Sequence, residues 1–302
     1  MPGRRRGVVN DGYAYRSVIR RSDAGRPALA YLAERYRHST EAVWRARVER
    51  GEVRVGDSPV AADGVLRAGD VLVWSRPAWD EPDVPLHFDV VHRDPDLLVV
   101  SKPAGLPTVP NGGFLAHTLL HAVRKTYPGA VPMHRLGRGT SGLVLFALSP
   151  EARRAVAAAW RGGEVMRTYR ALIAGTPTWD AIRIDTPIGL VSHPRLGRVH
   201  AASPGGKGAV SNVRVLVRRT ETAIVEVHIE TGRAHQIRIH LAAAGHALVG
   251  DPLYVAGGVP SSTPALPGDG GYLLHAHRLA LRHPTTAQLV ELEAPLPADL
   301  AV

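Results

Sequence analysis

The sequence predicts an α+β protein: a mixed, mainly antiparallel sheet with flanking helices, preceded by a small α/β module at the N-terminus. The chain has 302 residues, enough for about two domains. Its 45% content of hydrophobic residues is sufficient for a buried core. Beyond residue 86, strand patterns outnumber helical patterns and do not alternate regularly with them. This arrangement favours a mixed sheet over a doubly wound parallel one.

Residues 1–25 are polar, rich in arginine and poor in large apolar side chains, so we expect a basic N-terminal arm. Residues 1–50 hold 12 arginines against five acidic residues, and the whole chain has a formal net charge of +10. A positive surplus favours phosphate-rich partners, because cationic side chains displace the counterions condensed on nucleic acid. A solvated basic face without a partner is the alternative explanation.

Residues 26–75 have the pattern of a compact module with two helices and short strands. Leu29 and Leu32 recur at helical spacing, and Ser39 or Thr40 is a candidate N-cap for a second helix that ends at Gly51. The segments "VRV" and "GDVLVW" predict strands of a small sheet.

Residues 76–85 are acidic and rich in proline, which predicts a linker, and residues 86–302 then form the larger domain. Its first two strands flank a "DPD" turn. The segment "SPEARRAVAAAWRGG" predicts a helix with Ser149 as N-cap, Pro150 at its first position and Gly162 as terminator.

Three more strands are predicted at "TYRALIAG", "VRVLVRRT" and "AIVEVHIE", followed by a helix from about Ala234 to Ala244. Ile237 and Leu241 lie on its expected buried stripe, while His235 and Arg238 share a different face.

Several classes of protein are excluded or disfavoured by composition. The chain has no cysteine, which excludes disulfides and thiolate nucleophiles. It has no apolar run of the ~20 residues that a membrane span needs, and no secretory signal is evident, so we expect a cytoplasmic protein without a membrane partner. The spacings of His235 with His240 and of His275 with His277 do not form a metal-binding pattern, so we expect hydrogen bonding there and no metal.

The stretch "HRLGRGTSGLVLFAL", which begins at His134, is a glycine-rich polar loop that leads into a buried strand. It carries two arginines, Arg135 and Arg138, in the layout of a catalytic loop. It contains no carboxylate or thiol that could act as a nucleophile.

Five segments, in order along the chain, resemble the RluA-type pseudouridine synthase family. They run from about Val90 to Pro284 and comprise "LLVVSKPAGLPTVP", "HRLGRGTSGLVLFAL", "RTYRALIAG", "TGRAHQIRIHLAAAGHALVGDPLY" and "LHAHRLALRHP". The stretch from about Arg26 to Trp74 is similar to the S-four-like RNA-binding module, with its "G-x-V-x-V" turn and "L-x-x-GD" ending.

The resemblance implies an enzyme that isomerises uridine in RNA to pseudouridine without a cofactor or metal. It implies RNA as partner, with rRNA or tRNA as the expected substrates and no obligatory protein partner. By resemblance, Arg135 helps to displace the target base, Tyr169 packs on the uracil, and Arg233 pairs with the catalytic aspartate. A core tyrosine is the alternative for Tyr169. Further RNA contacts are expected from Arg138, His235 and Arg238, and from Arg35, Arg45 and Arg47 of the module.

The sequence departs from the family pattern at the residue expected to be the nucleophile. The pattern reads HRLD-x-x-TSG, and its aspartate position is Gly137 here; a frequent second aspartate corresponds to Gly139. Two altered positions favour a natural sequence over a variant made to silence the enzyme.

Three explanations of Gly137 remain open. Another acid reaches the cleft, with Glu230, Asp251 and Asp185 as candidates; or the protein is a catalytically silent RNA binder; or the loop serves a related nucleotide or sugar-phosphate reaction. Arg233, deprived of its family partner, is expected to have another anion near it, because an unpaired buried charge is expensive.

Overall fold

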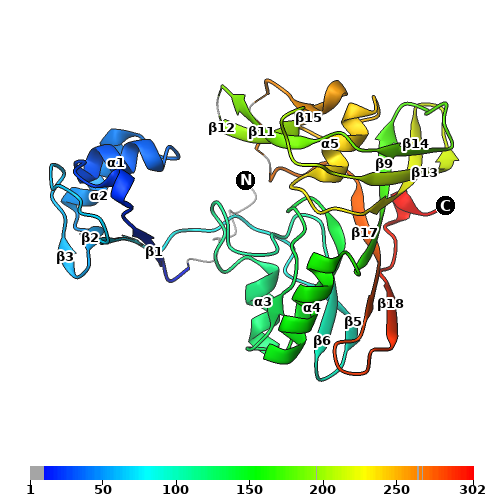
Figure 1. Cartoon of the computed structure of the whole chain (residues 1–302), viewed down its shortest axis with the longest axis horizontal. Helices are drawn as coiled ribbons and strands as arrows, with labels where there is room; N and C mark the ends of the chain where they lie inside the picture. The colour runs from blue at the N-terminus through cyan, green and yellow to red at the C-terminus, as the bar shows by residue number, and fades with distance from the viewer. Residues whose placement is uncertain (1–9, 195, 264, 267) are drawn as a thin grey trace, which may run out of the picture. The chain divides into compact units, whose positions relative to one another are not determined.

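The computed structural model describes residues 10–194, 196–263, 265–266 and 268–302. The chain divides into two compact units, with the boundary in the sequence between Glu81 and Pro82 (Figure 1). The mixed sheet and its few helices confirm the predicted fold class. The start of the predicted N-terminal arm, residues 1–9, lies outside the described residues.

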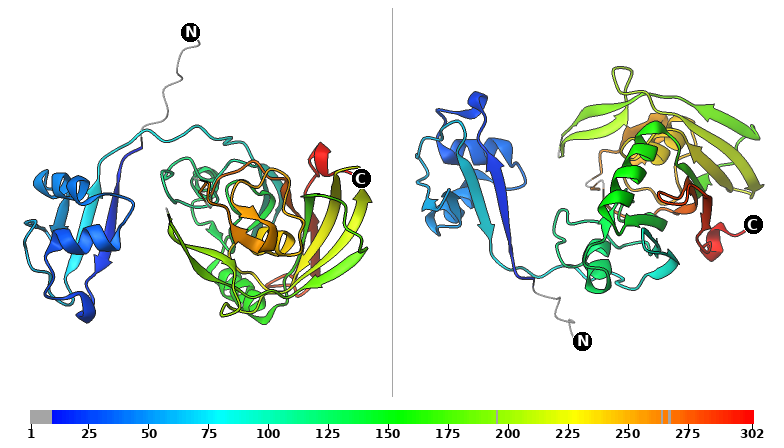
Figure 2. Two further views of the ribbon diagram at one scale, coloured as in Figure 1. Left: turned by 90° about the horizontal axis from the view of Figure 1, so that it is seen from above. Right: turned by 60° about the horizontal axis from the view of Figure 1, so that its bottom comes forward.

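The first unit is a four-stranded antiparallel sheet with two helices beside it (Figure 2). The strand order is β1-β4-β2-β3. The elements are β1 (Tyr13–Val18), α1 (Ala28–Arg35), α2 (Glu41–Glu49), β2 (Val53–Val55), β3 (Ser58–Pro59) and β4 (Val71–Arg76), with a short 3-10 helix at Arg21–Asp23.

Both helices of this unit follow the sequence signals. The Thr40 side chain accepts a hydrogen bond from the backbone N–H of Val43, as an N-cap does, and Gly51 follows α2 with φ of 72°. Leu32 and Trp44 are buried in one core with residues of the sheet. The predicted arm differs from the structure, because β1 pairs along its whole length with β4 and so belongs to the sheet.

The second unit is built on a ten-stranded sheet. Eight strands follow the order β10-β13-β14-β9-β17-β8-β6-β5, with β18 paired to β17 and β7 to β8. Only the β17–β8 pair among these is parallel. The strands are β5 (Asp89–Arg93), β6 (Leu97–Lys102), β7 (Val131–Pro132), β8 (Ser141–Ala147), β9 (Met166–Ala174), β10 (Ala181–Ile184), β13 (Ser211–Arg218), β14 (Thr222–Ile229), β17 (Leu274–Arg282) and β18 (Leu289–Glu293).

Helices cover both faces of this sheet. Leu98 and Val100 of β6 point into a core shared with α3 (Leu119–Thr126) and α5 (Gln236–Ala243). Leu97 and Val99, which alternate with them, pack in a second core with α4 (Pro150–Gly162). Strand β6 is therefore buried on both sides, as its continuous apolar run indicates.

The predicted helix ends are close to those observed. Ser149 caps α4 by accepting a hydrogen bond from the backbone N–H of Ala152. The left-handed C-cap is Gly163, with φ of 75°, one residue beyond the predicted Gly162. Helix α5 begins at Gln236, two residues after the predicted start, because His235 has a left-handed backbone with φ of 56°.

Two small hairpins complete the second unit: β11 (Ile188–His193) with β12 (Gly197–Ala202), and β15 (Tyr254–Val255) with β16 (Val259–Pro260). Two 3-10 helices lie at Ala256–Gly258 and Ala298–Leu300. Within the described residues, no helix is long and apolar enough to cross a membrane.

Candidate active site

The loop that starts at His134 is anchored at its first residue by a neutral imidazole. The ring stacks on Trp160 with the centroids 4.8 Å apart, and its Nε2 accepts a hydrogen bond of 3.0 Å from the backbone N–H of Leu145. Burial, assisted by the nearby Arg167 guanidinium, lowers the pKa of His134 to about 3. The unprotonated nitrogen is the form that can accept this bond.

The middle of the loop is fixed by buried polar groups. The Thr108 hydroxyl accepts from the backbone N–H of Leu136 and donates to its carbonyl. The Arg138 carbonyl accepts from the backbone N–H of Gly105 at 2.8 Å and from Lys102 Nζ at 3.3 Å. These contacts hold the backbone on both sides of Gly137 in one conformation.

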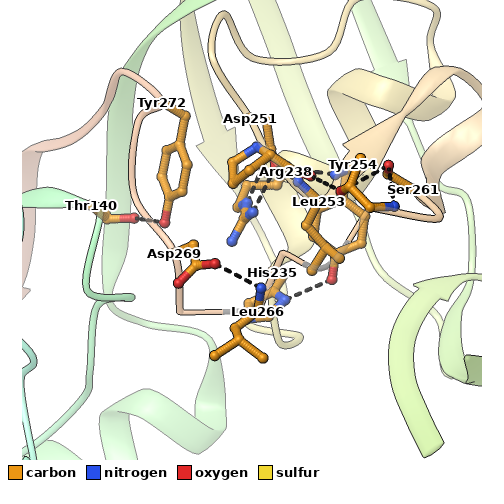
Figure 3. A network of polar contacts seen from close by, with 12 residues as sticks. Thr140, His235, Arg238, Asp251, Leu253, Tyr254, Ser261, Leu266, Asp269 and Tyr272 are labelled. Carbon is orange, nitrogen blue, oxygen red and sulfur yellow. Dashed lines mark hydrogen bonds and ion pairs between the residues drawn. The ribbon is translucent and has the colours of Figure 1, made fainter. Parts of the chain in front are cut away.

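The two glycines where the family pattern has aspartates face the segment around Tyr272. A Cβ atom on Gly137 would lie 3.2 Å from the Tyr272 hydroxyl, and a Cβ on Gly139 would lie 2.8 Å from the Cα of Gly270. The Tyr272 hydroxyl is also 3.3 Å from Thr140 Oγ1 (Figure 3). A side chain at position 139 would therefore displace the backbone of Gly270 or the ring of Tyr272.

The two arginines of the loop have different environments. Arg135 is exposed and forms no hydrogen bond or ion pair with the described residues. Arg138 donates through Nε to the Gly268 carbonyl and through Nη2 to Asp269 Oδ1. Arg135 can therefore bind an anionic group of a ligand, whereas Arg138 is already paired with the carboxylate of Asp269.

Tyr169 lies on β9, in the same hydrophobic cluster as Leu136 and Tyr272. Its side chain is buried, and burial raises the pKa of its hydroxyl. That hydroxyl has no hydrogen-bond partner among the described residues, yet it is not one of the polar atoms that are sealed from solvent. A buried ring with an open polar end can pack against a ligand as well as against the core.

Arg233 lies in the turn between β14 and α5, and this turn is organised by Gln236. The amide oxygen of Gln236 accepts from the backbone N–H of Arg233 and from the Thr231 hydroxyl. Gly232 lies directly against Arg167, because a Cβ there would be 3.1 Å from its Nη1. Since Arg167 is two residues from Tyr169 on β9, the turn lies beside the strand that carries this tyrosine.

The expectation that another acid of the chain accompanies Arg233 is wrong. The residue is exposed, and its Nε donates to the Gly208 carbonyl at 2.9 Å. No carboxylate of the described residues lies within 4.0 Å of its guanidinium. Water can solvate this charge, so the fold does not require an anion in place of the missing aspartate.

Arg238 and His235 both contact Tyr254, as their predicted common face suggests, but Arg238 is not a surface group. It is 3% exposed and forms a two-point ion pair with Asp251, with both N–O distances 2.7 Å (Figure 3). Its guanidinium also lies over the rings of Tyr254 and Tyr272. The prediction of Arg238 as an RNA contact is therefore wrong, because a buried and neutralised guanidinium does not reach phosphate.

His235 is held by the Tyr254 hydroxyl at 2.6 Å from its Nδ1. Burial and the charge of Arg238, with smaller effects of His200 and Arg135, lower the pKa of His235 to about 4. His235 therefore lies at this site as a neutral ring.

None of the three acids considered as replacements for the missing aspartate bonds to the loop. Asp251 is neutralised by Arg238 and accepts from the backbone N–H groups of Leu253 and Tyr254. Glu230 bonds to Arg183 and Asn212 on the sheet surface. Asp185 is exposed after β10 and has no contact with the loop.

The arginines proposed for the first unit lie on or beside its helices. Arg35 is exposed, and Arg45 is exposed and pairs with Glu41 one helical turn away. Arg47 is partly buried, because its guanidinium lies over the rings of Trp44 and Trp74. Their role in RNA binding stays a prediction.

The histidine pairs form hydrogen bonds, as expected. His275 Nδ1 bonds to the Ser141 hydroxyl, and His277 Nδ1 bonds to the Ala294 carbonyl. His240 bonds to the Ser211 hydroxyl and the Thr186 carbonyl. The described part of the chain has no group of three or more histidine and acidic residues suited to a metal ion.

Sequence reasoning missed the segment "GDGGY", which ends at Tyr272. It supplies Asp269, Gly270 and Tyr272, which contact Arg138, Gly139 and Thr140 respectively. Its two consecutive glycines were the available signal, since they permit close backbone approach. Nothing local in the sequence indicated that the partner would be the loop more than 125 residues earlier.

Comparison with known proteins identifies a family model and several relatives. Residues 96–243 match the family of RNA pseudouridylate synthases. The chain is 42% identical to an uncharacterized RNA pseudouridine synthase of Synechocystis sp., covering 90% of this chain and 94% of that protein. It is 36% identical to RNA pseudouridine synthase 5 of Arabidopsis thaliana, covering 97% and 95%.

Relatives of lower sequence identity are also named as pseudouridine synthases. The ribosomal large subunit pseudouridine synthase D of Neisseria meningitidis is 34% identical, covering 90% of this chain and 75% of that one. Among solved structures, human RNA pseudouridylate synthase domain containing 1 superposes with a TM-score of 0.55 at 26% identity, covering 72% and 86%.

Proposed function

Because the chain belongs to the RNA pseudouridine synthase family, we propose that it isomerises uridine in RNA to pseudouridine. One observation carries the proposal. The loop and the turn before α5 are each fixed by dedicated polar contacts, while Arg135 and the Tyr169 hydroxyl are left without partners among the described residues. These two groups are therefore available to a ligand.

The proposed reaction needs no cofactor. The bond from ribose C1′ to N1 of uracil breaks, a bond from C1′ to C5 forms, C5 loses its proton and N1 gains one. The target nucleotide must first leave its stack, at a cost of a few kcal/mol. In this proposal Arg135 contacts the phosphates or the vacated space, and Tyr169 packs against the uracil.

Arg233 contributes positive charge in the same proposal, whereas the charge of Arg138 is paired with Asp269. Arg233 is exposed, with a single carbonyl partner, and is available to the phosphate or ribose of the substrate. The module at residues 26–75, with Arg35, Arg45 and Arg47, is proposed to hold flanking RNA. Ribosomal RNA is the first substrate to test, because one relative is named for the large ribosomal subunit. A cytoplasmic location without membrane or obligatory protein partner is part of the proposal.

The second candidate is an RNA-binding protein without turnover, and Gly137 is the observation that favours it. A nucleophile or base is essential to this reaction, and glycine offers none. The two candidates share every RNA contact and differ only in chemistry. They are therefore separated by turnover and not by affinity.

Tritium release provides the test. Transcripts of large-subunit rRNA and of tRNA, labelled with tritium at C5 of uridine, are incubated with the full chain, and released tritium and chromatographed nucleosides are measured. The proposal predicts release equal to the pseudouridine formed. Retained tritium on RNA that the protein demonstrably binds would replace the proposal with the silent binder.

A further inference from the structure

The segment from Gly268 to Tyr272 is fitted to the loop at Gly137. Gly139 and Gly270 meet at backbone distance, since a Cβ on Gly139 would lie 2.8 Å from the Cα of Gly270. The hydroxyl of Tyr272 lies 3.3 Å from that of Thr140. These contacts place whatever precedes Gly270 directly beside the loop.

The residue that precedes Gly270 is Asp269, and its carboxylate is held on both oxygens. Oδ1 accepts from Arg138 Nη2 at 3.0 Å. Oδ2 accepts from the backbone N–H of Leu266 at 2.8 Å (Figure 3). Arg138 also donates a second hydrogen bond to the same segment, from Nε to the Gly268 carbonyl at 2.9 Å. Together these bonds fix the position and orientation of the carboxylate.

Asp269 is also accessible. Its side chain is 36% exposed and that of Arg138 31% exposed, so a substrate can reach the carboxylate without breaking the fold. Asp251 offers the opposite case, because its side chain is only 1% exposed and lies against the buried Arg238 guanidinium. In the described parts of the chain, Asp269 is the acid that bonds to the loop from His134 to Gly142.

We propose that Asp269 supplies, from the segment after α5, the carboxylate that the family pattern places at position 137. This inference rests on the proposed function. The chemical group is the same as the missing one, a carboxylate, and Arg138, the residue after Gly137, bonds to it. A carboxylate supplied by Asp269 instead of position 137 also explains why position 139 is glycine, because a side chain there would prevent the approach of Gly270.

In the reaction, the Asp269 carboxylate attacks C1′ of the ribose. The C1′–N1 bond breaks, its electrons stay on the uracil, and the carboxylate forms an ester at C1′. Rotation of the uracil brings C5 to C1′, the C1′–C5 bond forms and the ester bond breaks, which returns the carboxylate. The C5 proton passes to solvent and N1 takes one up, so atoms and charge balance.

The test compares Asp269→Asn with Asp269→Glu and Asp180→Asn in the full chain. Asp180→Asn is the matched control, because it also breaks an exposed aspartate–arginine pair, with Arg218 at 2.6 Å. Loss of a reacting carboxylate is expected to lower kcat for tritium release by about 100-fold or more, with little change in KM. Asp269→Glu should recover part of this loss, and Asp180→Asn should match the wild type.

Arg138→Ala separates chemistry from anchoring. If Asp269 only anchors Arg138, the two variants lose the same activity, and that result would overturn the inference. The inference predicts that Asp269→Asn loses at least about 10-fold more kcat than Arg138→Ala, because only the former removes the reacting group. Wild-type turnover that survives Asp269→Asn would reject Asp269 and leave the proposed function intact; a wild type without turnover on RNA that it binds would reject both.

Discussion

The second unit contains two arginine–aspartate pairs near Tyr272 that have the same chemistry and opposite environments. Arg238 and Asp251 are 3% and 1% exposed and bind at two points, with both N–O distances 2.7 Å. Arg138 and Asp269 are 31% and 36% exposed and bind at one, at 3.0 Å. The first pair is committed to the fold, and the second is accessible to a substrate.

The contrast teaches that the type and spacing of residues do not assign a role to a charged pair. Arg238 lies in a helix whose residues pointed to an RNA contact, yet burial makes it part of the core. Asp269 lies in a loop that has no recognisable sequence motif, yet its accessible carboxylate bonds to Arg138, the residue after Gly137.

The largest expected effect is on the buried pair. Asp251→Asn leaves the Arg238 guanidinium buried without a counter-charge, and should lower the free energy of unfolding by about 3–5 kcal/mol. Denaturant unfolding measures this loss, with Asp180→Asn as the exposed control. A loss below about 1 kcal/mol would place the pair among surface ion pairs and remove the contrast.

Acid should weaken the folded state through its neutral histidines. The pKa of His134 is lowered to about 3 and that of His235 to about 4, against about 6.5 in an unfolded chain. Below pH 6.5 the unfolded chain therefore binds more protons, and stability falls as the pH drops toward 4. Each histidine contributes a slope of about 1.4 kcal/mol per pH unit at most.

His134→Gln tests the larger of these two shifts. The amide keeps a hydrogen-bond acceptor for the Leu145 N–H but does not titrate, so the variant should lose less stability than the wild type between pH 6.5 and 4. Denaturant midpoints measured across this range provide the comparison. Parallel pH profiles for the two proteins would show that His134 is not the titrating group.

Gly139→Ala should separate the loop from the "GDGGY" segment. The added Cβ cannot lie 2.8 Å from the Gly270 Cα, so the segment must shift, at an expected cost of about 1–3 kcal/mol. Activity should fall with it, because Asp269 shifts too. Gly205→Ala is the control, since a Cβ there meets no atom within 4 Å; equal stability and activity of the two variants would refute the packing argument.

The smallest expected effect on stability is that of Asp269→Asn. An exposed ion pair contributes about 0–1 kcal/mol, so the variant should unfold close to the wild-type midpoint. Together with the large loss of kcat expected above, this result would distinguish a functional carboxylate from a structural one. A stability loss as large as that of Asp251→Asn would instead assign Asp269 to the fold.

Local signals predicted much of the fold. The caps at Thr40 and Ser149 and the buried strand from Leu97 depend on neighbouring residues only, and the structure has them. Strand β1 was missed because the arginines around it outweighed the pattern of its "YAYRSV" segment. Pairing with β4, more than 50 residues away, decides its structure.

The candidate site was less predictable for the same physical reason. The loop and the Arg233 turn were found from their motifs, but the burial of Arg238 depends on Asp251, Tyr254 and Tyr272 together. The contact of Arg138 with Asp269 joins residues 131 positions apart. Such contacts are set by the packing of the whole unit, which no window of the sequence contains.

Single-turnover tritium release from C5-labelled ribosomal RNA, with the wild type and Asp269→Asn at equal RNA occupancy, tests the central claim most directly. We predict release by the wild type and a rate lower by about 100-fold or more in the variant. Equal rates in the two proteins, or no release from RNA that the wild type holds, would contradict the account.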